Sequence, residues 1–209
     1  CLRDEDLRAD RQFEFMQLDA EMSFVDQEDV FAVISHTVAS ATEAVTGERP
    51  TEFPRITWLE AQERFGSDKP DTRFGMELVE LTPIFEDTEA RVFKAPCVKG
   101  IRMEGGMEAL SRNQVDALVE TCQLWGAKGL AWMKVIDGES GPALDAGVAK
   151  FLSADESSQV VAALEAQPGD MVFLVADERR LVRHVLGLLR LELGRPPVNE
   201  GGLNFRRVD

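Results

Sequence analysis

Five side chains near the start of the chain carry the groups that an acyl-adenylate reaction needs. They are Arg3, Glu5, Phe15, Gln17 and Asp19. In such a reaction a carboxylate attacks the α-phosphate of ATP, and a guanidinium suits this step because its planar fork binds phosphate and carboxylate oxygens together. An aromatic ring can stack on adenine, a carboxylate can accept from the adenine amine, and a further acidic or amide group can hold a substrate ammonium. The same composition is also that of a solvated, charged hairpin.

The alternation of residues 13–24 predicts a β-strand that would place several of these groups on one face. The even positions read Glu14, Met16, Leu18, Ala20, Met22 and Phe24, and the odd positions read Phe13, Phe15, Gln17, Asp19, Glu21 and Ser23. Because successive strand side chains point to opposite faces, one face is largely apolar and the other has two aromatics followed by four polar groups. A half-exposed antiparallel strand without a ligand has the same pattern. The two phenylalanines favour a binding face, since a solvated face has little use for them.

Two helices are predicted after this strand. Asp26 is expected to cap a helix over about residues 27–46, which has an apolar stripe at helical spacing. Thr57 is expected to cap a second, short helix with Glu60 as its capping-box partner. The segment GSDKPD at residues 66–71 is a loop by composition.

From about residue 78 to residue 195, strand and helix patterns alternate, which predicts a separate compact domain. Strands are expected at ARVFKA, CVKGIRM, GLAWMKVI and MVFLVA. Ser111 with Gln114 and Ser153 with Glu156 are the capping boxes of two helices. Asp177 is expected to cap the last helix.

Charge and cysteine usage limit the class of protein. A net charge of −15 argues against a broadly basic surface that binds nucleic acid without regard to sequence, but it leaves room for a local basic groove. No run approaches the roughly 20 apolar residues that span a bilayer, so no membrane partner is expected. Cys1, Cys97 and Cys122 are too widely spaced for a CxxC pair or a disulfide framework, which favours a reducing, cytoplasmic setting. The two histidines lie far apart and give no metal signature.

The segment RDEDLRADRQFEFMQLDAEMSF resembles motif 2 of the class II aminoacyl-tRNA synthetases, in the form found in bacterial-type aspartyl-tRNA synthetases. Leu2-Arg3-Asp4-Glu5 matches the general form Phe-Arg-x-Glu except at its first position. The resemblance continues through FVDQEDV and PRITWLEAQERFGSDKPDTRFGMEL. Farther along, LSRNQVDAL, GAKGLAW and AKFLS resemble an inserted GAD-type domain. Leu2 replaces the usual Phe, and Phe13 stands where Pro is common; both exchanges are apolar and are expected to alter packing rather than chemistry.

The resemblance implies an α+β fold, with part of the class II antiparallel-sheet catalytic core and an inserted α/β GAD domain of mixed strands and helices. Residues 1–77 would be the partial core, residues 78–195 the GAD-type domain, and residues 196–209 a return segment toward the core. Nothing in the sequence resembles motif 1, motif 3, the anticodon-binding domain or the residues that select the aspartate side chain. We therefore expect an internal fragment that does not aminoacylate tRNA by itself.

The resemblance also implies how motif 2 would bind ATP. Arg3 would be the catalytic residue, bridging the α-phosphate of ATP and the α-carboxylate of aspartate. Glu5 would accept from the adenine amine, Phe15 would stack on the adenine ring, and Asp4 and Gln12 would complete the ATP contacts. Magnesium would shield the phosphates, with its ligands mostly outside this segment and no metal ligand within it.

The amino acid and tRNA would be held by neighbouring residues of the same motif. Gln17 and Asp19 would face L-aspartate together with the catalytic arginine, Asp19 would hold its ammonium group, and Glu21 would be a neighbour. Arg8 and Arg11, in the motif 2 loop, are candidates for contacting the tRNA acceptor end, although they can equally be solvated loop arginines. Four lysines of the second domain could form a basic face toward tRNA, or could simply be solvated: Lys94, Lys99, Lys128 and Lys134.

Three interpretations of function remain open from the sequence. The first is an aspartate–tRNA ligase that uses ATP, L-aspartate and tRNA(Asp), homodimeric at full length, with a non-discriminating variant that also charges tRNA(Asn). The second is a stand-alone module in which residues 78–195 bind tRNA or a protein and the motif 2 segment is vestigial. The third is a nucleotide-binding domain of unknown substrate.

Overall fold

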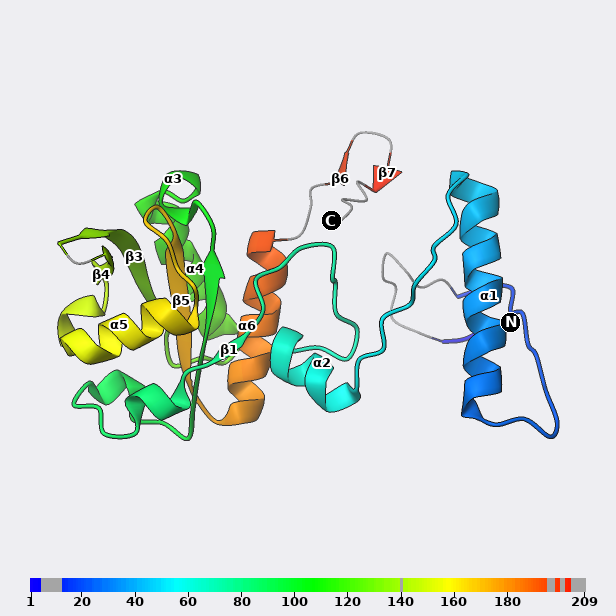
Figure 1. Ribbon diagram of the computed structural model, residues 1–209, viewed down its shortest axis with the longest axis horizontal. Helices are drawn as coiled ribbons and strands as arrows, with labels where there is room; N and C mark the ends of the chain where they lie inside the picture. Colours follow the sequence, from blue (N-terminus) through cyan, green and yellow to red (C-terminus); the bar gives the residue numbers. More distant parts are fainter. Residues whose placement is uncertain (5–12, 140, 195–197, 200–201, 204–209) are drawn as a thin grey trace. The chain divides into compact units, whose positions relative to one another are not determined.

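The computed structural model describes residues 1–4, 13–139, 141–194, 198–199 and 202–203 of the 209-residue chain. The chain divides into two compact units, Cys1–Arg55 and Ile56–Asp209. Figure 1 shows both, coloured along the sequence. Within the described ranges, no helix combines the length and the apolar character needed to cross a bilayer.

One long helix, α1 (Gln27–Thr46), dominates the first unit, as its capping signals predict. The Asp26 carboxylate accepts from the backbone N–H groups of Glu28 and Asp29. The Asp29 carboxylate in turn accepts from the Asp26 N–H at 3.0 Å, which completes a capping box. Gly47 ends the helix in the left-handed conformation, with φ of 78°.

The chain turns after α1 and runs back beside it (Figure 1). Arg49 pairs with Glu43 at 2.8 Å, and the Arg55 guanidinium forms two hydrogen bonds of 2.7 and 2.8 Å to the Glu28 carboxylate. Arg55 also lies over the ring of Phe31, 5.0 Å from its centroid. Exposed ion pairs of this kind contribute little to stability, so they set the path of the segment more than its stability.

The strand predicted over residues 13–24 is not formed. One isolated antiparallel bridge joins Leu2 to Glu14, and the residues that follow have no regular secondary structure. A strand requires a neighbour to take its backbone hydrogen bonds. Among the described residues, this segment finds such a neighbour only at the N-terminus of the chain. The apolar side chains of its even positions are consequently exposed, Met16 to 98% and Leu18 to 88%.

The second unit is built on a five-stranded sheet of order β1-β2-β5-β3-β4. The strands are β1 (Val79–Glu80), β2 (Cys97–Met103), β3 (Ala131–Gly138), β4 (Gly141–Asp145) and β5 (Met171–Asp177). Every pairing in the sheet is antiparallel. The predicted mixed α+β architecture is therefore confirmed, and its antiparallel sheet lies in the segment that the sequence analysis assigned to the inserted domain.

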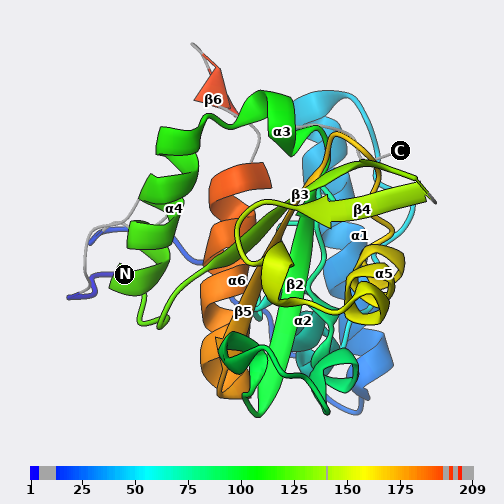
Figure 2. The same cartoon turned by 90° about the vertical axis from the view of Figure 1, so that its left-hand side faces the viewer.

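Helical segments cover both faces of this sheet. On one face lie α4 (Arg112–Leu124) and α6 (Arg179–Gly194), and on the other lie α5 (Ala154–Ala163) and the 3₁₀ turns η1 (Thr82–Phe85) and η2 (Arg91–Phe93). Figures 1 and 2 show α5 and α6 on opposite sides of the strands. The middle strand β5 is almost continuously apolar because its side chains are buried on both faces. The remaining elements are α2 (Trp58–Phe65), α3 (Gly106–Ala109), η3 (Ala149–Phe151), β6 (Val198–Asn199) and β7 (Gly202–Leu203).

Some of the helix caps and strands predicted for the second unit are formed, and others are not. The capping boxes of α4 and α5 are formed as predicted. Thr57 caps α2, but Glu60 does not return the hydrogen bond, because its carboxylate pairs with Arg64 at 2.6 Å. Asp177 is the last residue of β5, and its carboxylate accepts from the Glu178 N–H at 2.8 Å, just ahead of α6. The segment ARVFKA forms η2 instead of a strand.

Helix α2 packs against α6 at a close crossing that requires glycine. Gly66 has φ of 68°, and a Cβ at this position would lie 2.1 Å from the carbonyl oxygen of Arg183. A Cβ on Gly187 would lie 2.9 Å from the carbonyl oxygen of Phe65. Side chains at either position would force the two backbones apart, so the crossing is specified by these two residues.

A charged cluster ties α2 to the sheet and to α6. The Lys99 ammonium, whose side chain is 3% exposed, lies 2.7 Å from a Glu63 carboxylate oxygen and 3.7 Å from Glu80. Glu63 also pairs with Arg179 at 3.0 Å and with Arg183 at 2.9 Å. Burial alone would raise the pKa of Glu63, but these three cations together hold it below its usual value. Lys99 is thus a structural residue, and the prediction that it could join a basic surface is wrong.

Arg190 fixes the loop that follows α2. It is 1% exposed, and its guanidinium donates to the backbone carbonyls of Asp71, Phe74 and Gly75 at 2.8, 2.7 and 3.1 Å. It also lies 4.1 Å from the ring centroid of Phe74 and 4.9 Å from that of Phe65. Burial lowers the pKa of Arg190, and the nearby carboxylates of Asp71 and Glu77 partly oppose this shift. The loop is therefore held by α6.

The buried thiols predict a pH dependence of stability. Burial raises the pKa of Cys122 to about 12, whereas an unfolded cysteine ionises near about 8.5. The native state therefore holds this proton more tightly, so the stability it contributes is complete below about pH 8.5 and is lost as the pH rises toward about 12. We expect the urea midpoint to fall between about pH 8 and about pH 10. The Cys122→Ala variant should show a smaller fall; an identical fall would contradict the assignment.

Candidate active site

Two short segments of the first unit pair in an antiparallel register. The Arg3 N–H donates to the Phe13 carbonyl at 3.0 Å, and the Phe15 N–H donates to the Cys1 carbonyl at 3.1 Å. The α-ammonium of Cys1 donates to the Phe15 carbonyl at 2.8 Å. With Leu2 opposite Glu14, this register puts the odd-numbered residues of both segments on one face.

Three residues that the sequence predicts for the site come together on this face. The guanidinium carbon of Arg3 lies 5.3 Å from the ring centroid of Phe15, within the roughly 6 Å range of a cation–π contact. The Cys1 thiol donates to the side-chain carbonyl oxygen of Gln17 at 2.7 Å. Phe15 is half-buried and Phe13 is 46% exposed, so neither ring is sealed in a core. A cation, an aromatic face and an amide are therefore accessible to a ligand from the same side.

The acidic residues predicted for the site are exposed. Asp4, Asp19 and Glu21 are each solvent-accessible. Within the part of the chain that the structure describes, neither Asp19 nor Glu21 forms a hydrogen bond or an ion pair, so both carboxylates are available to a ligand cation. The other four predicted site residues, Glu5, Arg8, Arg11 and Gln12, lie outside the described residues.

Cys1 is a neighbour of the site that the sequence prediction missed. Its thiol contacts Gln17 across the bridge. The spacing of the residues could have revealed it. Cys1 precedes Arg3 by two residues and so points to the same face of an extended segment. All three cysteines are free thiols, and Cys1 alone among them is exposed.

The described residues do not form a metal site. No group of three or more His, Cys, Asp or Glu side chains within them is placed to bind a metal ion. The exposed carboxylates near the paired segments are not gathered around a common point, and a magnesium ion requires several oxygen ligands in near-octahedral geometry. The arrangement offers a cation and an aromatic face to a ligand, and no step through a metal follows from it.

Comparison with known proteins extends over both units. The profile of the family described as tRNA synthetases class II (D, K and N) matches residues 1–184. The chain is similar to the aspartate–tRNA ligase of Shouchella clausii, with 46% identity over 202 residues, covering 93% of this chain and 33% of that protein.

Two further aspartate–tRNA ligases are similar to this chain over nearly its whole length. The aspartate–tRNA ligase of Halalkalibacterium halodurans is 44% identical over 214 residues, covering 98% of this chain and 35% of that protein. The aspartate–tRNA(Asp/Asn) ligase of Anoxybacillus flavithermus is 46% identical over 202 residues, covering 93% of this chain and 33% of that protein. The chain thus spans about a third of the length of the curated relatives it matches.

Proposed function

This chain belongs to the class II tRNA synthetases of the D, K and N group, and we propose that it supplies part of the adenylate site of an aspartate–tRNA ligase. The enzyme would use ATP to convert L-aspartate into aspartyl-adenylate and would then transfer the aspartyl group to tRNA(Asp). The observation that supports this most is the shared face of Arg3, Phe15 and Gln17.

The first half-reaction needs positioning and charge stabilisation. An oxygen of the aspartate α-carboxylate attacks the α-phosphorus of ATP, the bond to the β-phosphate oxygen breaks, and pyrophosphate leaves with the bonding electrons. Arg3 would hold the attacking carboxylate and the α-phosphate together and neutralise the charge that builds up between them. No covalent enzyme intermediate is required. Magnesium would shield the charge of the phosphates, and the residues that hold it would lie outside the described residues.

The contact between Arg3 and Phe15 joins two of the residues that we propose bind ATP. The guanidinium rests over the ring face on which adenine would stack. Nucleotide binding would replace this cation–π contact, which is worth about 1 kcal/mol at an exposed site, with base stacking on the ring. The guanidinium would then be free to reach the α-phosphate.

The domain assignment is part of the same proposal. Residues 1–77 would belong to the catalytic core, residues 78–195 would form the inserted GAD-type domain, and residues 196–209 would lead back to the core. The start of the sheet at β1 supports a boundary near residue 78. The packing of α2 on α6 means that the last part of the proposed core segment is fixed to the proposed inserted domain.

The sequence identities to known relatives do not decide which tRNA the full-length enzyme would charge. Relatives named as aspartate–tRNA ligase and as aspartate–tRNA(Asp/Asn) ligase are both 46% identical to this chain. Charging of tRNA(Asn) therefore stays an alternative. The homodimeric assembly and the cytoplasmic location of the full-length enzyme stay predictions. A stand-alone module is less well supported, since one family profile matches the motif 2 segment together with most of the second unit.

Asp19 tests the amino-acid side of the proposal. In the full-length enzyme that contains this chain, Asp19→Asn should raise the KM for aspartate about tenfold or more, because a charge-assisted hydrogen bond to the substrate ammonium is worth about 1.5–3 kcal/mol. The KM for ATP should change little. Steady-state ATP–pyrophosphate exchange measures both constants. Glu14→Gln, on the opposite face of the same segment, is the matched control, and equal effects of Asp19→Asn on both substrates would show that the role is wrongly assigned.

A further inference from the structure

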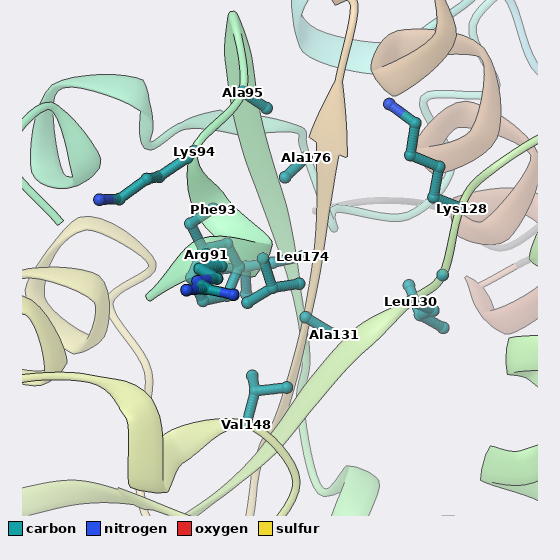
Figure 3. A pocket seen from close by; sticks show the side chains of 12 residues that line it. Arg91, Phe93, Lys94, Ala95, Lys128, Leu130, Ala131, Val148, Leu174 and Ala176 are labelled. Atoms are coloured by element: carbon teal, nitrogen blue, oxygen red, sulfur yellow. The ribbon is translucent and has the colours of Figure 1, made fainter. Parts of the chain in front are cut away.

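A pocket of about 360 Å³ lies over the end of β5, between η2 and the start of β3 (Figure 3). Leu174 and Ala176 of β5 form its floor. Its other apolar lining residues include Phe93, Leu130 and Val148. The volume falls at the small end of the roughly 300–1,000 Å³ typical of sites for small organic groups.

The pocket arises from the path of the backbone. Pairing between β3 and β5 stops at Ala131 and Leu174, whereas β5 continues to Asp177 along β2. The chain ahead of β3 therefore diverges from the end of β5. Gly129 lines the opening, and a Cβ added there would meet no heavy atom within 4 Å. The cavity thus lies where the segment ahead of β3 diverges from the end of β5.

The charge of the lining differs from that of the whole chain. The chain has 38 acidic and 23 basic residues, yet the pocket is lined by Arg91, Lys94 and Lys128 and by no Asp or Glu. Figure 3 shows Lys94 and Lys128 extending to opposite sides of Leu174 and Ala131. Lys128 pairs with Asp177 at 2.9 Å, while Arg91 and Lys94 have no ion-pair partner within the described residues. The pocket is therefore apolar in the middle, with Arg91 and Lys94 at one side and, at the other, a lysine whose charge is balanced by Asp177.

From this arrangement we infer that the pocket binds one unpaired nucleotide of an RNA strand. The base would lie on the apolar floor, one flanking phosphate would reach Lys94, and the other would replace Asp177 as the partner of the exposed Lys128. A nucleotide within a strand has this pattern of a flat ring with a negative charge on each side, and proteins commonly read RNA by accepting bases that are splayed out of single-stranded segments. The inference rests on the proposed function, in which the substrate is a tRNA.

The 209-residue chain itself allows the test, with a fluorescein-labelled single-stranded hexauridine as the probe and fluorescence anisotropy as the readout. Gly129→Leu adds a side chain at a position that lines the pocket and should weaken binding by about fivefold to 100-fold, the range expected for loss of one base contact. Lys94→Gln leaves the cavity open and should reduce the slope of log K against log salt by about 0.7, the value for one phosphate contact on a single strand. Lys150→Gln, an equal change of charge on η3 outside the pocket, should leave binding unchanged.

Three results would overturn the inference. The first is unchanged affinity in Gly129→Leu with a native circular dichroism spectrum; if that variant does not fold, an unchanged salt slope in Lys94→Gln has the same meaning. The second is uridine monophosphate binding as tightly as hexauridine, since the flanking phosphates would then have no role. The third is equal competition by double-stranded RNA. The RNA measurement contains neither ATP nor aspartate, whereas ATP–pyrophosphate exchange reports the adenylate site, so failure of the RNA site is distinguishable from failure of the adenylate site.

Discussion

ATP–pyrophosphate exchange by the full-length enzyme is expected to slow by about 10²–10³-fold when Arg3 is replaced by Ala. The guanidinium is proposed to neutralise the charge that develops as the aspartate carboxylate attacks the α-phosphate. Loss of one such group typically removes about 3–4 kcal/mol of transition-state stabilisation. Binding of ATP should weaken less than the rate falls, because the contact strengthens in the transition state.

Two variants make this result specific. Arg3→Lys keeps the charge but not the planar fork, so its exchange rate should fall between those of the parent and Arg3→Ala. Arg49→Ala removes an exposed arginine of the same unit that pairs with Glu43 on α1, and it should leave exchange unchanged. An exchange rate near that of the parent in Arg3→Ala would exclude the proposed role.

The largest effect on stability is expected at Arg190. Arg190→Met keeps much of the side-chain volume but removes the donor for three backbone carbonyls and the cation between two aromatic rings. Hydrogen bonds from a charged donor are worth about 1.5–3 kcal/mol each, and water can replace part of this because Asp71 and Phe74 are half-buried and Gly75 is exposed. We expect the free energy of unfolding to fall by about 3 kcal/mol, measured by urea denaturation with circular dichroism.

Arg112→Met on α4 is the matched control for this measurement. Arg112 pairs with Asp116 at 3.0 Å and lies over the ring of Trp132, but its side chain is 67% exposed. Its replacement should cost less than about 1 kcal/mol. Equal losses in the two variants would mean that the loop after α2 is not held by the buried guanidinium.

Helix ends in this chain were predictable because their determinants are local. A Ser or Asp at the cap and a Gln, Glu or Asp three residues later satisfy two backbone groups within a single turn. The boxes that begin with Asp26, Ser111 and Ser153 are all formed. At Thr57 the same signal was only half satisfied, since Arg64 attracts the Glu60 carboxylate one turn away.

Strands were less predictable because their partners are distant in the sequence. ARVFKA has the composition of a strand, but Phe93 is drawn into the core, where its ring stacks on Phe85 with centroids 4.4 Å apart. Strand β4 has the sequence GPALD, and its Gly and Pro made a strand hard to predict there. It is an edge strand, where both residues are tolerated. The segment at residues 13–24 has the alternation of a strand and lacks a neighbour within the described residues.

The part of the candidate site that depends on which residues share one face of an extended segment was predictable. Arg3, Phe15 and Gln17 share a face because the bridge between Leu2 and Glu14 fixes the register of two extended segments. The sequence did not show which of the four lysines suggested as a basic face are structural and which are exposed. Lys99 meets the carboxylate of Glu63 on another element, whereas Lys94 and Lys128 line the pocket. Such a division depends on tertiary contacts that no local pattern encodes.

A crystal structure of the full-length enzyme with a non-hydrolysable aspartyl-adenylate analogue would test the central proposal most directly. We predict that the Arg3 guanidinium lies about 2.7–2.9 Å from an oxygen of the α-phosphate or of its substitute, with adenine stacked on the ring of Phe15. An analogue bound with its phosphate out of reach of Arg3 and its adenine away from Phe15 would contradict the proposal.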